Sequence, residues 1–504
     1  MSDVQTQGEG KALSTSSGIE LRSIDWVPHE ERHGKVWHLG AVWFSGSAEL
    51  STLATGVLAI SLGGNLIWTL IAMLLGTVFG TFFTAFHSAQ GPQLGLPQMI
   101  QSRAQFGYIG VAVLVLPFMV FNYAGYNVFN TLLAAQSMDN VVHGGVKLWL
   151  VVITVIAGAA ALWGYDLIHL SQRWLTYAFI VFFGIYTFGV IFTIGGMPSN
   201  AWDLGTFSIT PFLASFMLCV SYQIGWAPYV SDYSRYLPAS AGVRSTFMWT
   251  YWGLVIGGYW LFAMGAVIAA PIAGDAPGAI SAIRATGDDI FGGFGATVLL
   301  LSVPALVMIV AMNMYGGGLV LISMVDSFKR LKPALWHRVA GILFIAVVAL
   351  AFAFYSTSNA DFLGYYNNLI VLLLYFFAPW TAVNLIDYFY VRKGHYAIRE
   401  IFNIDGIYGR WGKEGITAYL AGFVSMIPFM VVGASGTKFE WWIGPVARSL
   451  SYTDISVFIG LPVSAIVYVL MARNLDLARE RELEASEPHM TMAEIDSELR
   501  AEHG

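Results

Sequence analysis

The acidic residue Glu49 has the clearest chemical potential in this sequence. It is the only Asp, Glu, Lys or Arg that lies more than about one turn inside any of twelve long apolar stretches. An ionised group at the centre of a bilayer costs at least about 2.5–3.5 kcal/mol on insertion scales, so we expect Glu49 to lie in a polar cavity. Burial disfavours the charged form, which suits a group that takes up and releases a proton. The alternative is a structural carboxyl group, hydrogen-bonded to backbone that a helix break near Gly46 leaves free.

A second stretch, residues 221–238, combines helix-breaking residues with aromatic ones. Gly225 and Pro228 bracket Trp226 at the point where a spanning helix should be in mid-membrane. Glycine permits unusual backbone angles, and proline removes an amide donor, so together they predict a break in the helix. Broken helices at the midplane are typical of substrate sites in secondary transporters. A proline-kinked helix with an ordinary packed tryptophan is the alternative.

Several side chains have the chemistry to hold a flat, hydrogen-bonding ligand. Tyr123 and Asn127 are four residues apart and therefore share a helix face. The ring would cover one face of the ligand, and the amide, which both donates and accepts, would read its edge. The alternative roles are aromatic anchoring at the membrane interface and amide bonds between helices. The predicted substrate contacts are Ser45, Tyr123, Asn127, Gln223, Gly225, Trp226 and Asn313.

Composition indicates the elements that must position these residues. The chain has 504 residues, of which 57% are hydrophobic and only 11% charged, whereas soluble domains have about 25% charged residues. The sequence therefore predicts an all-α polytopic membrane protein whose apolar runs are each close to the length of one span. The twelve expected spans are 36–60, 65–86, 106–137, 146–164, 174–195, 207–231, 246–271, 291–325, 339–356, 362–386, 416–433 and 455–471.

The same composition limits the partners. The chain has one cysteine, so neither a disulfide framework nor a thiolate metal cluster is expected. A basic surface for nucleic acid is absent from the sequence, and no cofactor is predicted beyond a coupling cation. The expected partners are the lipid bilayer and a small planar heterocycle. The pattern does not fix the oligomeric state, and a monomer is compatible with it.

The distribution of basic residues predicts the orientation in the plasma (cytoplasmic) membrane. With twelve spans, both termini lie on one side. If that side is the cytoplasm, 21 of the 25 Lys and Arg residues are cytoplasmic, as the positive-inside rule requires. We therefore expect both tails, 1–35 and 473–504, to be cytoplasmic. The second tail is charged and helix-favouring, and the expectation is a solvated helix without chemistry.

Matched interruptions along the chain suggest an internal repeat. Gly46 and Gly225 are 179 residues apart, and Asn127 and Asn313 are 186 residues apart. These similar offsets predict two five-helix halves, 36–195 and 207–390, followed by two further helices in 415–472. Because five is odd, the second half would be inverted, and inverted repeats place the substrate at their interface. Chance spacing in a chain with 53 glycines is the alternative.

In this order and spacing, several motifs resemble the nucleobase-cation-symport-1 family, in particular its purine-cytosine permease branch. The resemblance implies a leucine-transporter-like fold of five plus five inverted helices with breaks in helices 1 and 6. It also implies symport of a nucleobase with a cation, a ring sandwich between Tyr123 and Trp226, and edge contacts from Asn127 and Asn313. Tyr123 stands where the family usually has Trp. The motifs are Glu31-Arg32, Trp43-Phe44-Ser45, Ser102-Arg103-Ala104-Gln105-Phe106-Gly107, Gly225-Trp226-Ala227, Asp232-Tyr233, Asn313-Met314-Tyr315 and Asp387-Tyr388 with Gly394.

Two departures from the family bear on the coupling ion. Sodium-coupled relatives use hydroxyls on helix 8 shortly before the Asn, but residues 305–312 contain no Ser or Thr, and a hard cation requires oxygen ligands. Fungal relatives have a Glu on helix 5, and the corresponding span here has no acid. The leading hypothesis is a proton-coupled importer of cytosine or a purine that uses Glu49. The alternative is a sodium-coupled hydantoin or allantoin permease. A channel or a membrane-embedded enzyme is disfavoured, because an enzyme would need several converging ionisable groups.

Overall fold

The structure is a computed structural model that describes residues 26–163, 165–272, 278–329, 331, 335–357 and 362–486. Nine helices within these ranges are long and apolar enough to cross a membrane. The first predicted span is broken into two short helices, the fifth qualifies only over Tyr177–Thr193, and the eleventh has 14 helical residues. The prediction of a polytopic helical membrane protein is confirmed.

One group of helices, here called the bundle, contains both broken spans. Its helices pack closely because glycines remove side chains from the contacts. A Cβ at Gly56 would lie 2.1 Å from the carbonyl oxygen of Phe262, and one at Gly76 would lie 2.4 Å from that of Phe216. The bundle consists of α1 (His38–Ser47), α2 (Leu50–Ser61), α3 (Leu66–Leu94), α10 (Ile209–Ile224), α11 (Val230–Ser234) and α12 (Val243–Ala269).

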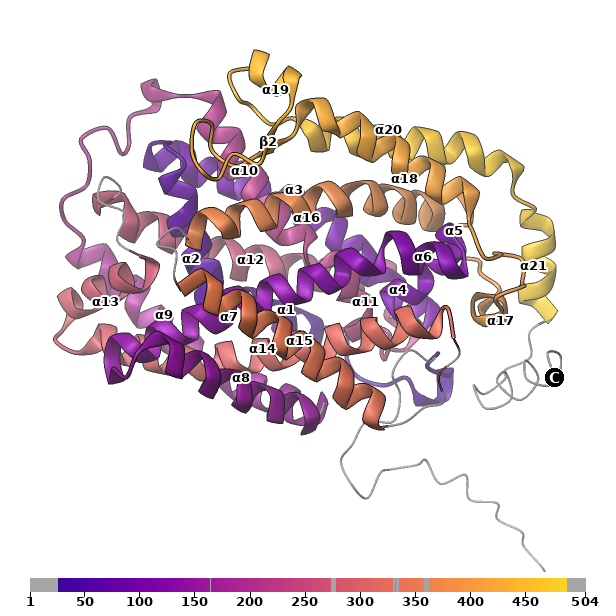
Figure 1. Ribbon diagram of the computed structural model, residues 1–504, viewed down its shortest axis with the longest axis horizontal. Coiled ribbons are helices and arrows are strands. Elements are labelled where there is room, and N and C mark those ends of the chain that lie inside the picture. The colour runs from indigo at the N-terminus through magenta and orange to yellow at the C-terminus, as the bar shows by residue number, and fades with distance from the viewer. Residues whose placement is uncertain are drawn as a thin grey trace, which may run out of the picture.

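A second group, the scaffold, packs beside the bundle (Figure 1). Its central pair is α7 and α14, which run antiparallel. Tyr108, the first residue of α6, which precedes α7, donates a hydrogen bond to Asp326 at the end of α14 (3.4 Å), whereas the Tyr123 ring lies against Gly316 further back along α14. The scaffold consists of α6 (Tyr108–Leu114), α7 (Leu116–Val142), α8 (Val146–Trp163), α14 (Phe294–Asp326) and α15 (Leu335–Thr357).

The helix directions show that the two halves are inverted. The order of the glycine contacts along the helices shows that α1 and α2 run parallel to α12, and that α3 runs parallel to α10. Ser88 of α3 bonds Thr250 of α12, whereas a Cβ at Gly258, further along α12, would lie 3.7 Å from Thr77, earlier on α3, so these two helices are antiparallel. Helix α10 therefore runs opposite to α1. The first helix of each half packs on the second helix of the other half, as an inverted repeat requires. The exact boundaries of the repeats stay a prediction.

The remaining elements surround these groups and define two ends of the molecule (Figure 1). The long ones are α9 (Tyr165–Thr193), α16 (Phe362–Ile386), α18 (Lys413–Met426) and α20 (Ser456–Met471). The hairpin end holds β1 (Val431–Val432), β2 (Trp442–Ile443), α13 (Ala279–Ile290) and α19 (Pro445–Ser449). The tail end holds α4 (Gln98–Gln101), α5 (Arg103–Phe106), α17 (Ile398–Phe402) and α21 (Leu477–Ser486).

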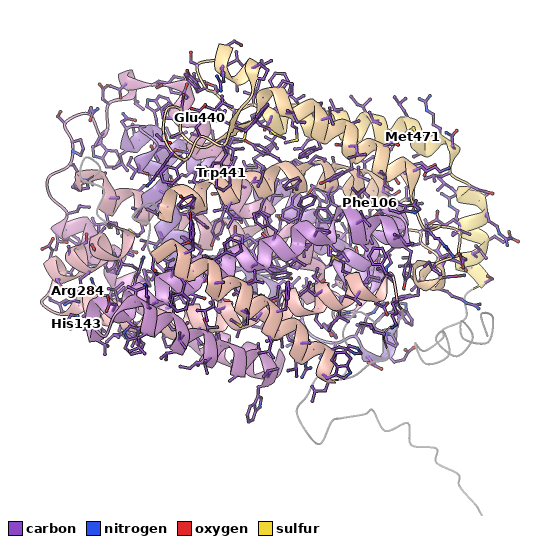
Figure 2. All side chains as sticks on the ribbon, in the orientation of Figure 1. Phe106, His143, Arg284, Glu440, Trp441 and Met471 are labelled. Carbon is purple, nitrogen blue, oxygen red and sulfur yellow. The ribbon has the colours of Figure 1, made fainter. Side chains whose placement is uncertain are left out.

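Labelled side chains help to locate these ends. His143 and Arg284 lie toward the hairpin end, and Phe106 and Met471 toward the tail end (Figure 2). The predicted span 416–433 is too long at its end. Helix α18 stops at Met426 and gives way to a short turn and β1, because Pro428 cannot continue the hydrogen-bond pattern.

The second tail forms a helix over α21, most of whose residues are exposed or half-buried as predicted, but Glu480 is an exception. Glu480 is only 4% exposed, and its two carboxylate oxygens accept hydrogen bonds from Arg392 Nε at 2.9 and 3.0 Å. The Tyr408 hydroxyl donates a third bond at 2.5 Å. These partners fix the helix to the tail end of the molecule. Residues 1–25 and 487–504 of the predicted tails lie outside the described residues.

Candidate functional site

The first spanning segment breaks at Glu49, not at Gly46. Gly46 lies inside α1, whose last turn closes normally, and Glu49 follows in extended conformation (φ −141°, ψ 169°) as the residue that precedes α2. Glycine is tolerated within a helix, so its presence did not mark the break. A Cβ at Gly46 would lie 3.9 Å from the Trp226 ring, which is an ordinary van der Waals contact, so Gly46 faces the second break.

The Glu49 side chain is buried among neutral groups. It is 3% exposed, and its Oε1 accepts hydrogen bonds from Ser51 Oγ (2.6 Å) and the Tyr222 hydroxyl (3.4 Å). Oε2 has no partner among the described residues. Within the same residues, no Lys, Arg or His forms an ion pair with it. The positive end of the α2 dipole partly offsets the cost of burying a charge here. This environment can therefore hold both protonation states.

The second break, in the span that begins with α10, is confirmed. Helix α10 ends at Ile224, and a short 3-10 turn, Ala227–Tyr229, separates it from α11. Trp226 lies at this break and is 5% exposed. Its ring makes an edge contact with Trp43 of α1 (centroids 5.8 Å apart, interplanar angle 70°). The indole nitrogens of both tryptophans are buried without a partner among the described residues. The two breaks thus meet through Trp43 and Trp226.

Tyr229 lies between the two rings that were predicted to sandwich a ligand. Its centroid is 5.3 Å from Tyr123, with an interplanar angle of 31°, and 5.5 Å from Trp226. The predicted aromatic walls are therefore connected through a third ring. The sequence reasoning did not select Tyr229, although it lies three residues after Trp226 in the stretch that was singled out. Any ligand between these walls would also touch or displace the Tyr229 ring.

The predicted amides Asn127 and Asn313 lie at one level of the scaffold. Helices α7 and α14 are antiparallel and meet at Tyr123 and Gly316. Asn127 is about one turn beyond that contact on α7, and Asn313 is about one turn before it on α14, so both are displaced toward the hairpin end. Asn127 is fully buried, and neither of its amide atoms has a partner among the described residues. Buried amides are normally hydrogen-bonded, and a polar ligand edge would satisfy this one.

The remaining residues that were predicted to contact substrate make contacts within the protein. Gln223 Nε2 lies 3.5 Å from the carbonyl oxygen of Leu254 on α12, and Ser45 Oγ donates to the carbonyl oxygen of Val42 at 2.8 Å. Gly225 is the residue after α10, where a Cβ would lie 3.2 Å from the Tyr126 hydroxyl. Gly225 therefore lies next to Tyr126, and a substrate contact through Gly225 stays a prediction. Substrate contacts through Ser45 and Gln223 stay a prediction.

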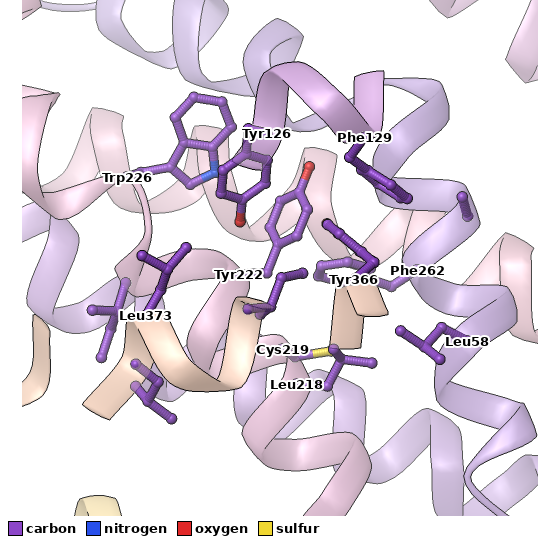
Figure 3. Packing of buried hydrophobic residues seen from close by; sticks show 14 of the residues in the cluster. Leu58, Tyr126, Phe129, Leu218, Cys219, Tyr222, Trp226, Phe262, Tyr366 and Leu373 are labelled. Atoms are coloured by element: carbon purple, nitrogen blue, oxygen red, sulfur yellow. The ribbon is translucent and has the colours of Figure 1, made fainter. Parts of the chain in front are cut away.

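A cluster of hydroxyl groups next to Glu49 was missed in the sequence. Tyr222 bonds Thr52 Oγ1 at 2.7 Å as well as Glu49. Tyr126 of α7 lies edge-on to Tyr222, with centroids 6.0 Å apart. Figure 3 shows both rings beside Trp226. The only available signal was that both tyrosines occur within the stretches already selected for Asn127 and Trp226.

A cavity of about 670 Å³ lies at the hairpin end, between the bundle, the scaffold and α16. Leu58 and Ser61 of α2 line one wall, and Gln136 of α7 lines another. Asn368 of α16 also lines it, and its Oδ1 has no partner among the described residues. The cavity therefore reaches down along α2 toward Glu49 from the hairpin end. Within the described residues, no group of three or more His, Cys, Asp or Glu could hold a metal ion.

Known proteins resemble this chain over most of its length. Residues 26–460 match the family described as permease for cytosine/purines, uracil, thiamine and allantoin. The Bacillus subtilis protein YxlA, whose name assigns it provisionally as a purine-cytosine permease, is 34% identical over 90% of this chain and 96% of its own length. The purine-cytosine permease fcyB of Emericella nidulans is 25% identical over 92% of this chain and 91% of its own.

Solved structures resemble the fold. Mhp1, a nucleobase-cation-symport-1 family transporter, in a closed conformation with bromovinylhydantoin bound, gives a TM-score of 0.68 at 17% identity and covers 94% of this chain and 100% of its own. The inward-facing conformation of Mhp1 gives 0.69 at 17% identity over 96% of this chain and 98% of its own. The predicted fold, inverted halves with broken helices 1 and 6 and two added helices, is confirmed.

Proposed function

The chain belongs to the family of permeases for cytosine/purines, uracil, thiamine and allantoin, and we propose that it imports a planar nucleobase of the cytosine or purine type by proton symport. Its family members are permeases, not enzymes. The hairpin end faces outward in this proposal, and the tail end faces the cytoplasm. Substrate enters from the hairpin-end cavity and is released at the tail end by alternating access.

The observation that supports this proposal best is the concentration of unpartnered polar atoms where the two helix breaks meet. Trp43, Glu49, Asn127 and Trp226 each have at least one buried polar atom without a partner among the described residues. Such atoms are costly unless something completes their hydrogen bonds. A flat heterocycle offers ring faces to the aromatic side chains and donor and acceptor edges to the amides.

Glu49 is the proposed proton carrier. It is buried without a cationic partner, so protonation removes a charge from the interior rather than breaking an ion pair. Its place between α1 and α2 links its protonation to the geometry of the break that contacts Trp226. In the proposed cycle, protonated Glu49 and bound base together stabilise the state that opens toward the tail end.

Purified protein in proteoliposomes tests the coupling. We expect labelled cytosine or hypoxanthine to accumulate under an inward proton gradient without sodium, and Glu49→Gln to abolish this accumulation. Counterflow at equal pH should persist in Glu49→Gln, because exchange of loaded carrier needs no net proton movement. Full pH-driven accumulation in Glu49→Gln would refute the proposed role of Glu49.

A sodium gradient separates the alternative. Residues 305–312 of α14, just before Asn313, contain no side-chain hydroxyl to ligate sodium, so we expect sodium to have no effect on uptake. Accumulation that follows sodium, ignores a pH step and prefers hydantoin or allantoin would favour the sodium-coupled permease instead. A thermal-shift panel of these compounds identifies the substrate class, because a bound ligand raises the melting temperature.

A further inference from the structure

A row of hydroxyl groups follows α2 from the hairpin-end cavity to Glu49. Leu58 and Ser61 line the cavity, and Thr55 lies about one turn deeper on the same helix. The Tyr366 hydroxyl of α16 is 3.3 Å from Thr55 Oγ1. Both side chains are buried, and neighbouring residues of α16 line the cavity. The row therefore begins just beneath the cavity wall.

The deeper part of the row reaches the carboxyl group. Ser51 is one turn before Thr55, and Thr55 Oγ1 donates to its carbonyl oxygen at 2.8 Å. Ser51 Oγ lies 2.6 Å from Glu49 Oε1 and 3.4 Å from the Tyr222 hydroxyl. Residues four apart on a helix are neighbours on its surface. Thr55 and Ser51 therefore lie on one face of α2, and the path requires the Thr55 hydroxyl to turn from the backbone carbonyl toward the Ser51 hydroxyl.

We propose that Thr55 and Tyr366, with Ser51 and Tyr222, form the path by which a proton reaches Glu49 from the hairpin-end cavity. This inference rests on the proposed proton coupling through Glu49 and deepens it. A hydroxyl group both donates and accepts. Each oxygen in the row accepts a proton from the preceding group and releases its own to the next. The net result is one proton moved from a hydronium ion in the cavity to the Glu49 carboxylate, with only O–H bonds broken and formed.

The groups around Glu49 fit a neutral relay. The titratable side chains that face it are Tyr222 of α10, Tyr126 of α7 and Tyr366 of α16. Helix α12 also packs on α2, but the residues at that contact are Phe262 and Gly265, which do not titrate. Phenols ionise only near pH 10 in water, so Glu49 is the group of this set that changes charge during transport. The stacked Phe129 and Tyr366 rings, 3.4 Å apart, hold the first hydroxyl in place (Figure 3).

The experiment compares two rates in proteoliposomes that contain the full chain. One is net uptake of labelled cytosine or hypoxanthine driven by an inward proton gradient, and the other is exchange at equal pH. Thr55→Val and Tyr366→Phe each remove one hydroxyl and keep the shape of the side chain. We expect each to slow net uptake about tenfold and to enlarge the ratio of rates in H2O and D2O, while exchange keeps its wild-type rate. Thr81→Val is the matched control, because Thr81 on α3 is buried with a hydroxyl outside the row.

The outcomes separate the path from the proposed function. Slowed net uptake in both variants, with normal exchange and a normal control, supports the path. Wild-type net uptake in either variant overturns it, because groups in series are each required. A parallel loss of exchange, or an equal loss in Thr81→Val, also overturns it, since the effect is then structural. If the proposed proton coupling through Glu49 is wrong, the result is different, because the Glu49→Gln variant then keeps proton-driven accumulation.

Discussion

Two regions of the molecule bury carboxyl groups, and they treat them in opposite ways. Near the helix breaks, Glu49 has only hydroxyl neighbours and one oxygen without a partner among the described residues. At the tail end, Asp387 and Glu480 share the guanidinium of Arg392, which forms ion pairs with both. We call these three residues the tail-end charge cluster. Gln105, Tyr396, Tyr408 and Tyr468 also donate hydrogen bonds to its carboxylates.

The difference indicates which carboxyl group can change its charge. Protonation of either carboxyl group at the tail end would remove an ion pair with Arg392, whereas protonation of Glu49 removes none, and these shared ion pairs join helices at the tail end. Asp387 lies in a π-helical turn at the end of α16, and it bonds Tyr468 of α20 as well as Arg392. The cluster thus joins α16, α20 and α21. Glu49 lacks such a constraint, which agrees with its proposed role as a carrier.

The largest effect is expected from breaking the tail-end charge cluster. Arg392→Met leaves Asp387 and Glu480 buried without a cation, which typically costs about 3–5 kcal/mol. The free energy of unfolding, measured by denaturant titration in detergent, should fall by that amount. Glu49→Gln is the contrast. This substitution leaves no charged group without its partner, so the free energy of unfolding should change by about 1 kcal/mol or less. Equal losses in the two variants would remove the distinction between the regions.

A smaller effect is expected at the aromatic side of the neutral region. Trp226→Ala removes a ring that would stack on a flat base, and such stacking is worth about 1–3 kcal/mol per base. The dissociation constant for the nucleobase, measured by equilibrium binding, should rise about 5- to 150-fold. Trp411→Ala provides a control at the tail end, where that ring is 50% exposed. Unchanged affinity in Trp226→Ala would place the substrate elsewhere.

The docking of α21 should depend on pH. Burial raises the pKa of the Glu480 carboxyl above its ordinary value of 4.5, and the Arg392 guanidinium offsets only part of this shift. The docked helix therefore binds this proton more tightly than the released helix does. Docking should therefore weaken as the pH rises from about 4.5 through the raised pKa.

Hydrogen exchange measures this dependence. After correction for the intrinsic rate, the protection of the α21 amides should decrease across that pH window. Glu480→Gln should make the protection independent of pH there. Protection in the wild-type protein that stays constant or rises over the same window would contradict the expected sign.

The smallest effect is expected where an ion pair is exposed. Arg410 and Asp405 form a pair at 2.9 Å, but their side chains are 58% and 51% exposed. Exposed pairs contribute about 0–1 kcal/mol because water and salt screen them. Arg410→Gln should therefore change the free energy of unfolding far less than Arg392→Met. A loss as large as that of Arg392→Met would show that burial is not what separates the two arginines.

Much of the fold was predictable because its signals are local. A single acid in an apolar span identified Glu49, and Gly225 with Pro228 identified the second break. The place of the first break was not predictable from Gly46, since a helix ends where its backbone hydrogen bonds end. Nor could Tyr222 be told from the other tyrosines of a chain that has 24. Arg392 and Glu480 are 88 residues apart in the sequence. Their pairing depends on the direction of the chain after α20, which no local sequence pattern encodes.

The seating of α21 has a practical consequence for recombinant work. A purification tag or fluorescent reporter joined directly to α20 would replace Glu480, a side chain that fills the interior of the tail end. Arg392 would then lose one of its two anionic neighbours. Fusions joined beyond Ser486 leave this docked helix intact, and yields from shorter truncations would report on damage to the folded protein rather than on poor synthesis.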